Sequence, residues 1–427
     1  MQSDNNNLLK IRKLKVKNFR CFEEREFEFD DEFTVLVGDN GAGKTAVLDG
    51  LASALSCLMW VFHRGEQEEQ VPFDSLDARL VSAPTAALPR LEPQYPVEVC
   101  CHGAMGDTEV SWGRDVPEGR REWPFLHDYS SKLLDLRDQP VWPLIAYYGS
   151  GRFVERAGPV DELVGQRPRS HGYAGCLNAT ASEKWFLTWF RTLELTGIQE
   201  GIPVPVLAGV KRVVVDCLGY CDDVVWATRD DQLLVTLKGR HGLPFRALSS
   251  GQRIMLSLVA DMASRASYLN PQFEEHAAAE TPGVVLIDDV DLHLHPKWQR
   301  TVVEKLRRTF PKVQFIATTH SPFIIQSLRE GELLVLDEAE HGEYAGKSIE
   351  DVVENVMGVE LPQRSERYRR MMAAAERYYR VLQRAKGASA EEQERLKAEL
   401  DELAAPFSDD VAYQAFLKME RIAAGLE

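Results

Sequence analysis

The residues with the clearest chemistry form a short loop near the N-terminus. The loop reads Gly38-Asp39-Asn40-Gly41-Ala42-Gly43-Lys44-Thr45 and matches G-x-x-x-x-G-K-[ST] at every fixed position. In such a loop, backbone amides and the N-terminus of the following helix surround a phosphate. Lys44 would neutralise the β and γ oxygens, and Thr45 would bind Mg²⁺. We therefore expect a Mg-ATP site whose cradle is formed by Gly38, Asn40, Gly41, Ala42, Gly43, Lys44, Thr45 and Ala46.

Two carboxylates follow an apolar run later in the chain. Residues 284–287 are all apolar, and Asp288 and Asp289 come directly after them. A buried strand would deliver both side chains to its exposed end. There Asp288 would hold Mg²⁺ through water, and Asp289 would be the general base that deprotonates the attacking water. Taken alone, this pattern is equally typical of a strand that ends in a turn, so the neighbouring segments decide the interpretation.

Two further segments offer groups for a γ-phosphate. Residues 315–319 form another largely apolar strand, and we expect His320 at its end to donate to the γ-phosphate and to sense its loss. The run Leu248-Ser249-Ser250-Gly251-Gln252 precedes an apolar helix, so its hydroxyl and amide groups would lie at a helix N-terminus. An N-capped helix would explain Ser249 but not the whole run. The expected phosphate contacts in this run are Ser249, Ser250, Gly251 and Gln252.

These side chains need strands and helices that hold them together. Residues 11–19 and 26–29 read as a strand pair, and residues 34–37 form a short buried strand that runs into the glycine-rich loop. The composition changes after residue 63, and apolar strands return near residue 284. We divide the chain into an N-terminal half of the ATPase core (1–62), an inserted region of β-hairpins and helices (63–245), a second half of the core with His320 (246–336), and a helical C-terminal region that could dock a partner (337–427).

Composition narrows the class of protein. The formal net charge of −16 argues against a surface that coats nucleic acid as a whole. The first residues lack the apolar segment of a secretory signal, and the apolar stretch over 48–62 is too short to cross a membrane. Seven cysteines without a C-x-x-C zinc pattern fit reduced thiols, so we expect a cytoplasmic protein with no membrane contact. Two interpretations, a local basic patch or a solvated strand face, stay open for Lys10, Arg12, Lys13, Lys15, Lys17 and Arg20.

The order of these motifs resembles that of ABC-type ATPases, specifically the SMC, RecF and OLD branch. Residues 11–22 resemble the opening strand of that branch. Asp291-Leu292-His293-Leu294-His295-Pro296, together with Thr319-His320-Ser321-Pro322, is similar to OLD-type ATPases. Ala146-Tyr147-Tyr148-Gly149-Ser150-Gly151-Arg152 adds a similarity to the PtuA-like ATPases of Septu and retron anti-phage systems. The resemblance implies an α/β fold: an ABC-type P-loop ATPase head with a mixed sheet, an inserted α/β region and C-terminal helices.

The resemblance also implies a function. ABC-type heads close around Mg-ATP, so the signature Leu248-Ser249-Ser250-Gly251-Gln252 of one subunit would meet the γ-phosphate held by another. We therefore expect an ATPase that forms a homodimer or a higher homo-oligomer. Its similarity to Septu ATPases implies regulation of a separate nuclease, of the HNH type, in anti-phage defence. DNA or a retron nucleic acid is a further candidate ligand.

Two alternatives stay open. One is an SMC-like or RecF-like ATPase acting in DNA repair, although long coiled-coil arms are missing from the sequence. The other is an OLD-like nuclease, whose Toprim domain needs a Glu and a D-x-D cluster on strands. After His320 only residues 333–336 resemble a strand, followed by Asp337 and Glu338. We therefore do not expect nuclease activity within this chain.

The sequence departs from the family pattern at two places. The family has Glu where this chain has Asp289, whose side chain is shorter by one methylene, about 1.5 Å in reach. A misplacement near 1 Å can cost about 10²-fold in rate, so we expect slow hydrolysis. The chain also lacks a clear Q-loop glutamine. Arg152 stands near the position of that loop, either as a phosphate contact or as a surface arginine.

Overall fold

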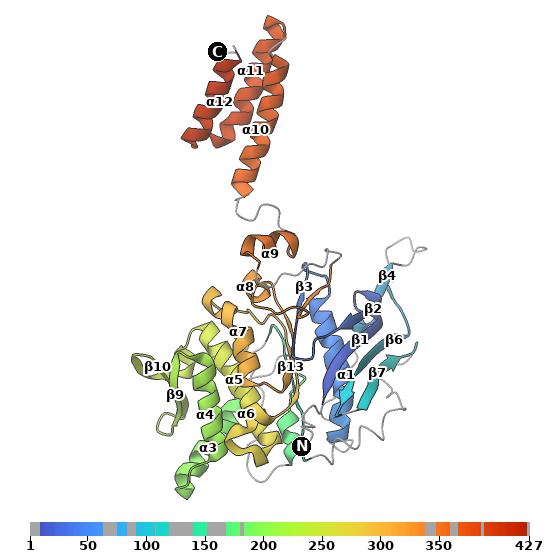
Figure 1. The fold of residues 1–427 in the computed structure, drawn as a ribbon, viewed down its shortest axis with the longest axis vertical. Coiled ribbons are helices and arrows are strands. Elements are labelled where there is room, and N and C mark those ends of the chain that lie inside the picture. Colours follow the sequence, from blue (N-terminus) through green and yellow to red (C-terminus); the bar gives the residue numbers. More distant parts are fainter. Residues whose placement is uncertain are drawn as a thin grey trace. The chain divides into compact units, whose positions relative to one another are not determined.

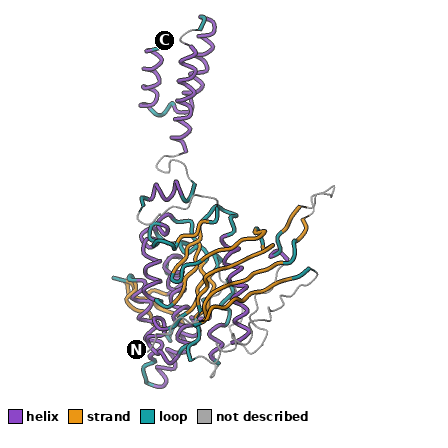
Figure 2. Tube along the Cα trace, turned by 45° about the vertical axis from the view of Figure 1, so that its right-hand side comes forward, coloured by secondary structure: helices purple, strands orange, loops and turns teal. Residues whose placement is uncertain are grey.

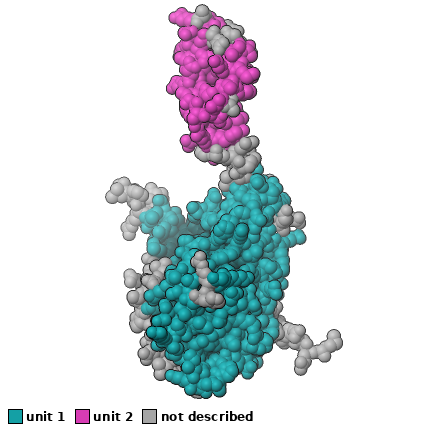
Figure 3. Space-filling model, turned by 90° about the vertical axis from the view of Figure 1, so that its left-hand side faces the viewer, with its two compact units in different colours: residues 1–357 teal, residues 358–427 magenta. Residues whose placement is uncertain are grey.

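The chain folds into two compact units, residues 1–357 and 358–427 (Figure 3). The computed structural model describes residues 9–62, 75–82, 91–106, 108–118, 140–151, 168–179, 183–337, 347–358, 366–385 and 388–424. Within these residues, no helix combines the length and the apolar character needed to span a membrane.

A five-stranded parallel sheet forms the centre of the first unit. Its strand order is β14-β3-β13-β12-β8. Four of these strands, β3, β8, β12 and β13, are buried along their whole length. Short apolar runs of this kind are typical of parallel strands that are covered on both faces. The bounds are β3 (Phe33–Val37), β8 (Leu144–Tyr148), β12 (Gly283–Ile287), β13 (Val313–Thr318) and β14 (Leu333–Val335).

An antiparallel sheet lies beside helix α1 (Lys44–Phe62), which packs against three of its strands (Figure 1). The strand order is β2-β1-β6-β7. Apolar residues of β1 such as Leu14 and Val16 are buried, whereas Lys13, Lys15 and Lys17 lie on the other face of the strand. The bounds are β1 (Lys10–Phe19), β2 (Phe22–Glu28), β6 (Val97–Met105) and β7 (Thr108–Val116).

The lysines of β1 form ion pairs with glutamates of the neighbouring strands. Lys13 pairs with Glu26 and Glu28, and Lys15 pairs with Glu24 across the β1–β2 ladder. Lys17 pairs with a glutamate of β6. Exposed pairs of this type contribute little stability, but they cancel the positive charge of this face. The structure therefore favours a solvated strand face over a basic patch for these three lysines.

The third part of the first unit is mainly helical. Helices α3 (Lys184–Glu200) and α4 (Pro205–Leu218) pack against the buried helix α5 (Ser250–Leu269). A small antiparallel sheet, β11-β10-β9, lies beside them. The helices and β-hairpins expected within residues 63–245 are present here as α3, α4 and the β9–β10 hairpin. The remaining bounds are β4 (Leu80–Ser82), β5 (Leu91–Pro93), β9 (Cys221–Ala227), β10 (Gln232–Leu237), β11 (Arg240–Pro244), α6 (Ala277–Glu280), α7 (Pro296–Thr309), α8 (Pro322–Ile325) and α9 (Ile349–Asn355).

The region 63–245 supplies strands to both sheets of the core. Strand β6 pairs with β1, and β8 pairs in parallel with β12. Figure 2 shows these strands in orange beside the others of the first unit. The region expected to be an insertion therefore contains β8, the edge strand of the parallel sheet. The sequence did not show this, because a five-residue apolar run does not reveal which strand it pairs with. At the other end, α9 packs on α8 and belongs to the first unit.

The second unit is a three-helix bundle with its own core. Its helices are α10 (Glu366–Ala385), α11 (Ala390–Ala404) and α12 (Val411–Ala423), within the C-terminal region that the sequence predicts to be helical. Val381, Leu382, Leu396 and Leu400 are buried in this core, and Leu403 packs against it. On α12, however, Phe416 and Met419 are 48% and 69% exposed.

Candidate functional site

The glycine-rich loop connects β3 to α1, as the sequence predicts. Gly41 and Gly43 have φ angles of 93° and 98°, which favour glycine. A Cβ at Gly43 would also lie 2.4 Å from Cζ of Phe22 and 2.7 Å from Sγ of Cys21. The turn between β1 and β2 therefore packs directly on the loop, and only glycine fits at residue 43.

Lys44 is buried at the start of α1. Its Nζ donates to the carbonyl oxygens of Gly38 and Asp39, at 2.7 and 3.0 Å. Burial lowers the pKa of Lys44, whereas the nearby carboxylates of Asp289 and Asp337 act in the opposite direction. Phosphate oxygens would favour the charged ammonium in the same way, so this lysine suits an anionic ligand.

Asp288 joins three elements at the end of β12. Its carboxylate accepts hydrogen bonds from Thr45 Oγ1 at 3.1 Å and from Thr318 Oγ1 at 2.7 Å. Its backbone N–H donates to the carbonyl of Tyr148, at the end of β8, at 2.8 Å. The carboxylate and the Thr45 hydroxyl are oxygen donors, which Mg²⁺ prefers, and Mg²⁺ usually takes its other ligands from water and substrate phosphates. In the described part of the chain no cluster of three or more His, Cys, Asp or Glu offers another metal site.

Asp289 has an unusual backbone conformation. Its φ is 49°, in the left-handed region, and its N–H donates to Thr318 Oγ1 at 2.7 Å. Asp and Asn tolerate this region better than longer side chains do. Thr318 therefore holds both carboxylate residues, one through the side chain and one through the backbone. Sequence reasoning did not find this role of Thr318, because a threonine at the end of an apolar strand carries no distinctive signal.

His320 is exposed and lies next to the glycine-rich loop. It lines a pocket of about 150 Å³ together with Gly38, Asp39 and Asn40. Its backbone N–H donates to Asp291 Oδ1 at 3.4 Å, and the hydroxyl of Thr319 also donates to this carboxylate. The structure thus brings the predicted histidine and the predicted loop together, with Asp291 fixing the backbone that carries the histidine.

The signature residues cap helix α5. Ser249 is the N-cap, and its Oγ accepts the N–H of Gln252 at 3.4 Å. In return, the side chain of Gln252 accepts the N–H of Ser249 at 3.1 Å, which completes a capping box. A Cβ at Gly251 would lie only 2.4 Å from the carbonyl oxygen of His293. The segment that follows Asp289 therefore packs on the signature turn.

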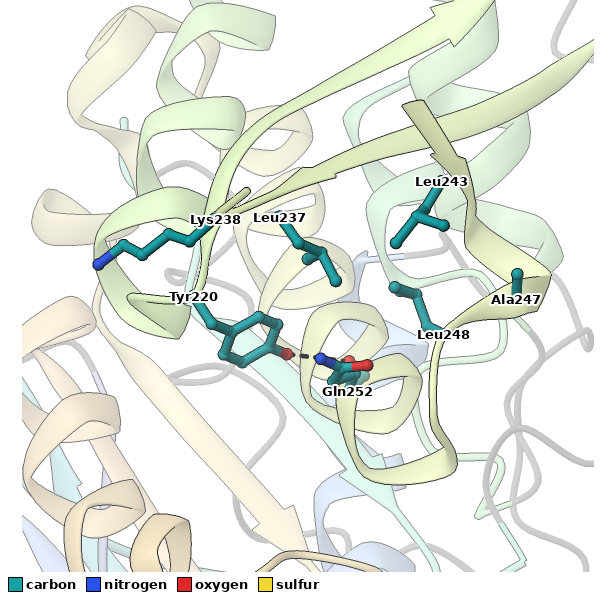
Figure 4. Close-up of a pocket in the computed structure, with 7 residues that line it drawn as sticks. All are labelled: Tyr220, Leu237, Lys238, Leu243, Ala247, Leu248 and Gln252. Carbon is teal, nitrogen blue, oxygen red and sulfur yellow. Dashed lines mark hydrogen bonds between the residues drawn. The ribbon is translucent and has the colours of Figure 1, made fainter. Parts of the chain in front are cut away.

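Two aromatic rings support this turn from the other side. Tyr220 donates its hydroxyl to the carbonyl of Gln252 at 3.2 Å (Figure 4). Its ring stacks on Trp298 with centroids 4.7 Å apart. Burial raises the pKa of Tyr220, so the phenol is a donor at neutral pH. Figure 4 shows Leu243 and Leu248 facing the hollow beside this tyrosine, a pocket of about 320 Å³.

A polar network next to Asp288 escaped the sequence analysis. Asp49 lies one helical turn after Thr45 and accepts the hydroxyl of Tyr147 at 2.8 Å. Arg20 pairs with Asp49 and, at 3.0 Å, with Asp77. Burial raises the pKa of Asp49, although Arg20 and Tyr147 act against this. The i,i+4 spacing from Thr45 could have pointed to Asp49, but no sequence signal joins it to residues so far along the chain.

The predicted phosphate contacts fall into two groups. Lys44, Thr45, Asp288, Asp289 and His320 gather around the glycine-rich loop. Within the described residues, no hydrogen bond or ion pair joins that loop to the signature. The side chains of Ser249 and Gln252 bond within the signature turn, and the carbonyl of Gln252 accepts the hydroxyl of Tyr220. Arg152 lies outside the described residues.

Comparison with known proteins identifies two matching family models. Residues 144–326 match the family described as "AAA domain, putative AbiEii toxin, Type IV TA system". Residues 13–57 match a second family described as "AAA domain". The first match spans β8, the signature, the two carboxylates and His320, and the second contains the glycine-rich loop.

Curated relatives match over most of the chain. The "Retron Ec83 probable ATPase" of Escherichia coli is 30% identical over 401 residues, covering 77% of this chain and 71% of that protein. The "Retron Vc95 probable ATPase" of Vibrio cholerae serotype O1 biovar El Tor is 24% identical over 391 residues, covering 79% and 75%. A "Septu protein PtuA" of Bacillus thuringiensis is 27% identical over 164 residues, covering 35% of this chain and 41% of that protein.

Among solved structures, the "SMC head domain from Thermotoga maritima" is 16% identical, with a TM-score of 0.41, covering 75% of this chain and 92% of that chain. The assignment to a family follows from the curated relatives and from the architecture described above: a glycine-rich loop between β3 and α1 of a parallel sheet, with carboxylates at the end of β12. The chain belongs to the family of retron ATPases, and its first unit carries the glycine-rich loop of a P-loop ATPase between β3 and α1.

Proposed function

We propose that this protein binds and hydrolyses Mg-ATP at the glycine-rich loop. The observation that carries the proposal is the contact between Thr45 and Asp288, with Lys44 at the same end of the sheet. These residues would hold Mg²⁺, which supplies positive charge at the β- and γ-phosphates. Main-chain amides of residues 41–45 would surround the phosphates, at the N-terminus of α1.

In this proposal Asp289 orients and deprotonates the attacking water, and His320 donates to the γ-phosphate. Both side chains belong to segments that Thr318 and Asp291 hold in place. The short side chain of Asp289 reaches less far than a glutamate, so turnover is slow. A slow ATPase suits a timer or a switch, because the ATP-bound state then persists.

We further propose that two heads close around ATP. The capped N-terminus of α5 presents the hydroxyl of Ser249 and the main-chain amides of Ser250 and Gly251, which suit an anionic ligand. Because no described contact joins this turn to the loop of its own chain, the γ-phosphate that it meets belongs to a second subunit. The assembly is a homodimer or a higher homo-oligomer.

The biological role that we propose is the control of a separate nuclease in anti-phage defence. Names of relatives support it, since they refer to retrons and to Septu. The second unit supports it as well, because its bundle contains none of the residues assigned to ATP and leaves apolar residues of α12 exposed. An HNH nuclease is the proposed partner, and DNA or a retron nucleic acid is the proposed trigger.

The test combines hydrolysis with association. The full chain should release phosphate from Mg-ATP, and Asp289→Asn should retain ATP without hydrolysing it. Light scattering should then show a larger particle for Asp289→Asn with Mg-ATP than without it. Phosphate release no faster than that of a Lys44→Ala control would refute the ATPase assignment, and an unchanged particle size would refute ATP-dependent association.

A further inference from the structure

Asp337 lies at the end of the edge strand β14, next to the glycine-rich loop. Strand β14 runs parallel to β3 with Val335 opposite Val37, so both strands end on the same side of the sheet. The backbone pairing continues one residue further, where the N–H of Leu336 donates to the carbonyl of Val37 at 2.9 Å. In the sequence, Asp337 stands out only as a candidate for a nuclease site, together with Glu338, which lies outside the described residues.

The carboxylate of Asp337 contacts the first two residues of the loop. Its Oδ2 accepts the backbone N–H of Asp39 at 2.6 Å. The same oxygen would lie 2.8 Å from a Cβ at Gly38, so Asp337 occupies the space that a side chain there would need. Hydrogen bonds to an ionised carboxylate are short and strong. This bond therefore fixes the path of the chain as it leaves β3.

The position of this bond leaves the phosphate cradle free. The Asp39 amide precedes the amides of residues 41–45, which would surround the phosphates. At the same time, Lys44 Nζ donates to the carbonyl oxygens of Gly38 and Asp39, the two residues that Asp337 holds. Asp337 thus fixes the backbone on which the side chain of Lys44 rests.

We propose that Asp337 is a positioning residue of the nucleotide site, which fixes the start of the glycine-rich loop through the Asp39 amide and thereby sets the affinity for Mg-ATP. The inference rests on the proposed function, since it concerns the same site. It assigns Asp337 to nucleotide binding in place of nuclease chemistry. Without the bond, the loop must be ordered when ATP binds, and that ordering reduces the affinity.

Two variants separate the hydrogen bond from the charge. Asp337→Asn keeps an oxygen that can accept the Asp39 N–H and removes the negative charge. Asp337→Ala removes both. The Kd for Mg-ATP, measured by calorimetry on the full chain, should be roughly 3- to 10-fold higher for Asp337→Ala than for Asp337→Asn. KM should follow Kd, while kcat stays within about twofold, because the bond acts on binding and not on the reacting atoms.

Hydrogen exchange supplies a second measurement, and Glu330→Gln a matched control. The Asp39 amide should exchange faster in Asp337→Ala than in wild type, with Asp337→Asn between them. Glu330 is exposed and precedes β14, at the opposite end of that strand from Asp337, so Glu330→Gln should change neither quantity. Equal Kd values for Asp337→Ala and Asp337→Asn would overturn the inference. A wild-type chain that binds no Mg-ATP would overturn the proposed function and this inference with it.

Discussion

At the scale of single residues, Asp289 shows how the backbone limits the choice of side chain at the position that we propose for the general base. Its φ of 49° lies in a region where Asp and Asn are favoured over longer residues. The backbone bond to Thr318 keeps this conformation in place. A glutamate would reach further toward the attacking water but would fit this backbone less well. The aspartate therefore combines an easily adopted turn with a short reach.

The variant Asp289→Glu tests this balance. We expect kcat for ATP to rise by roughly 10-fold, because the added methylene brings the carboxylate closer to the water. We also expect the chain to lose about 1 kcal/mol of stability from the less favourable backbone conformation. Phosphate release and thermal unfolding measure the two effects on the same sample. A variant that is slower than wild type at unchanged stability would contradict this account of Asp289.

Lys44 gives a second prediction at this scale. Lys44→Ala removes the only cation that the structure places among the described residues of the glycine-rich loop, so hydrolysis of Mg-ATP should fall to the background level. Lys418→Ala serves as the matched control, since Lys418 is exposed on α12 in the second unit. Lys418→Ala should melt like wild type, and Lys44→Ala should stay folded but melt at a lower temperature, because it loses two hydrogen bonds to loop carbonyls. Equal rates of phosphate release by Lys44→Ala and Lys418→Ala, in a preparation free of other ATPases, would refute the role of Lys44.

The sequence predicted the residues of the local motifs better than the residues that support them. The loop from Gly38 to Thr45 is contiguous, so its pattern can be read directly, and the structure places it between a strand and a helix as expected. Asp337 contacts Asp39 from a position 298 residues away, and Tyr147 contacts Asp49 from 98 residues away. Such pairs have no local pattern, because only the order of strands in the sheet brings them together.

At the scale of elements, the signature turn depends on three neighbours. A Cβ at Gly251 would lie 2.4 Å from the carbonyl oxygen of His293 and 3.7 Å from the ring of Trp298, and Tyr220 donates its hydroxyl to the carbonyl of Gln252. His293 belongs to the segment between the two carboxylates and α7, and Trp298 lies near the start of α7. If this segment moves on hydrolysis, the signature turn of the same chain must therefore shift as well, because the two are closely packed.

Gly251→Ala tests this contact. A Cβ at this position would lie 2.4 Å from the carbonyl oxygen of His293, a backbone atom that cannot rotate away. We expect a loss of about 1–3 kcal/mol of stability and a weaker ATP-dependent association, because the turn must shift to make room. Ser408→Ala is the control, since Ser408 is exposed in the second unit and is not part of the proposed nucleotide site. A Gly251→Ala protein that melts and associates like Ser408→Ala would contradict the contact.

Strand pairing explains what the sequence could not show about the elements. Apolar runs located the core strands within a few residues, for example β12 and β13. The assignment of β8 to the parallel sheet was not visible, because its five buried residues are compatible with any sheet. Register and strand order follow from long-range packing, which no local pattern encodes.

At the scale of the whole molecule, the residues assigned to ATP and the C-terminal helical bundle belong to different folding units. All residues assigned to ATP lie in residues 1–357, whereas the bundle of residues 358–427 has its own core. That core includes Tyr378, Leu382 and Leu400. A unit with an independent core should fold without the rest of the chain, and removing it should leave the ATPase intact.

A truncation after residue 357 tests this separation. The shortened protein should remain folded and hydrolyse Mg-ATP at a rate similar to that of the full chain, because no residue of the nucleotide site is removed. It should no longer co-purify with the nuclease that we propose as its partner. Phosphate release and tandem affinity purification measure the two properties. If the truncated protein still retains the partner, the second unit is not the docking surface.

A point variant makes the same test within the folded bundle. Met419 on α12 is 69% exposed. Burial of this apolar side chain against a partner would remove it from water and so stabilise the complex. Met419→Asp should therefore reduce co-purification of the partner strongly without changing helix content or ATP hydrolysis, because burying an unpaired carboxylate is costly.

Met372→Asp is the matched control, since Met372 is 45% exposed on α10 and receives the same change. Loss of the partner by Met419→Asp and its retention by Met372→Asp would place the docking surface on α12. Equal retention by both variants would exclude α12, because the surface would then tolerate a charge at its most exposed methionine.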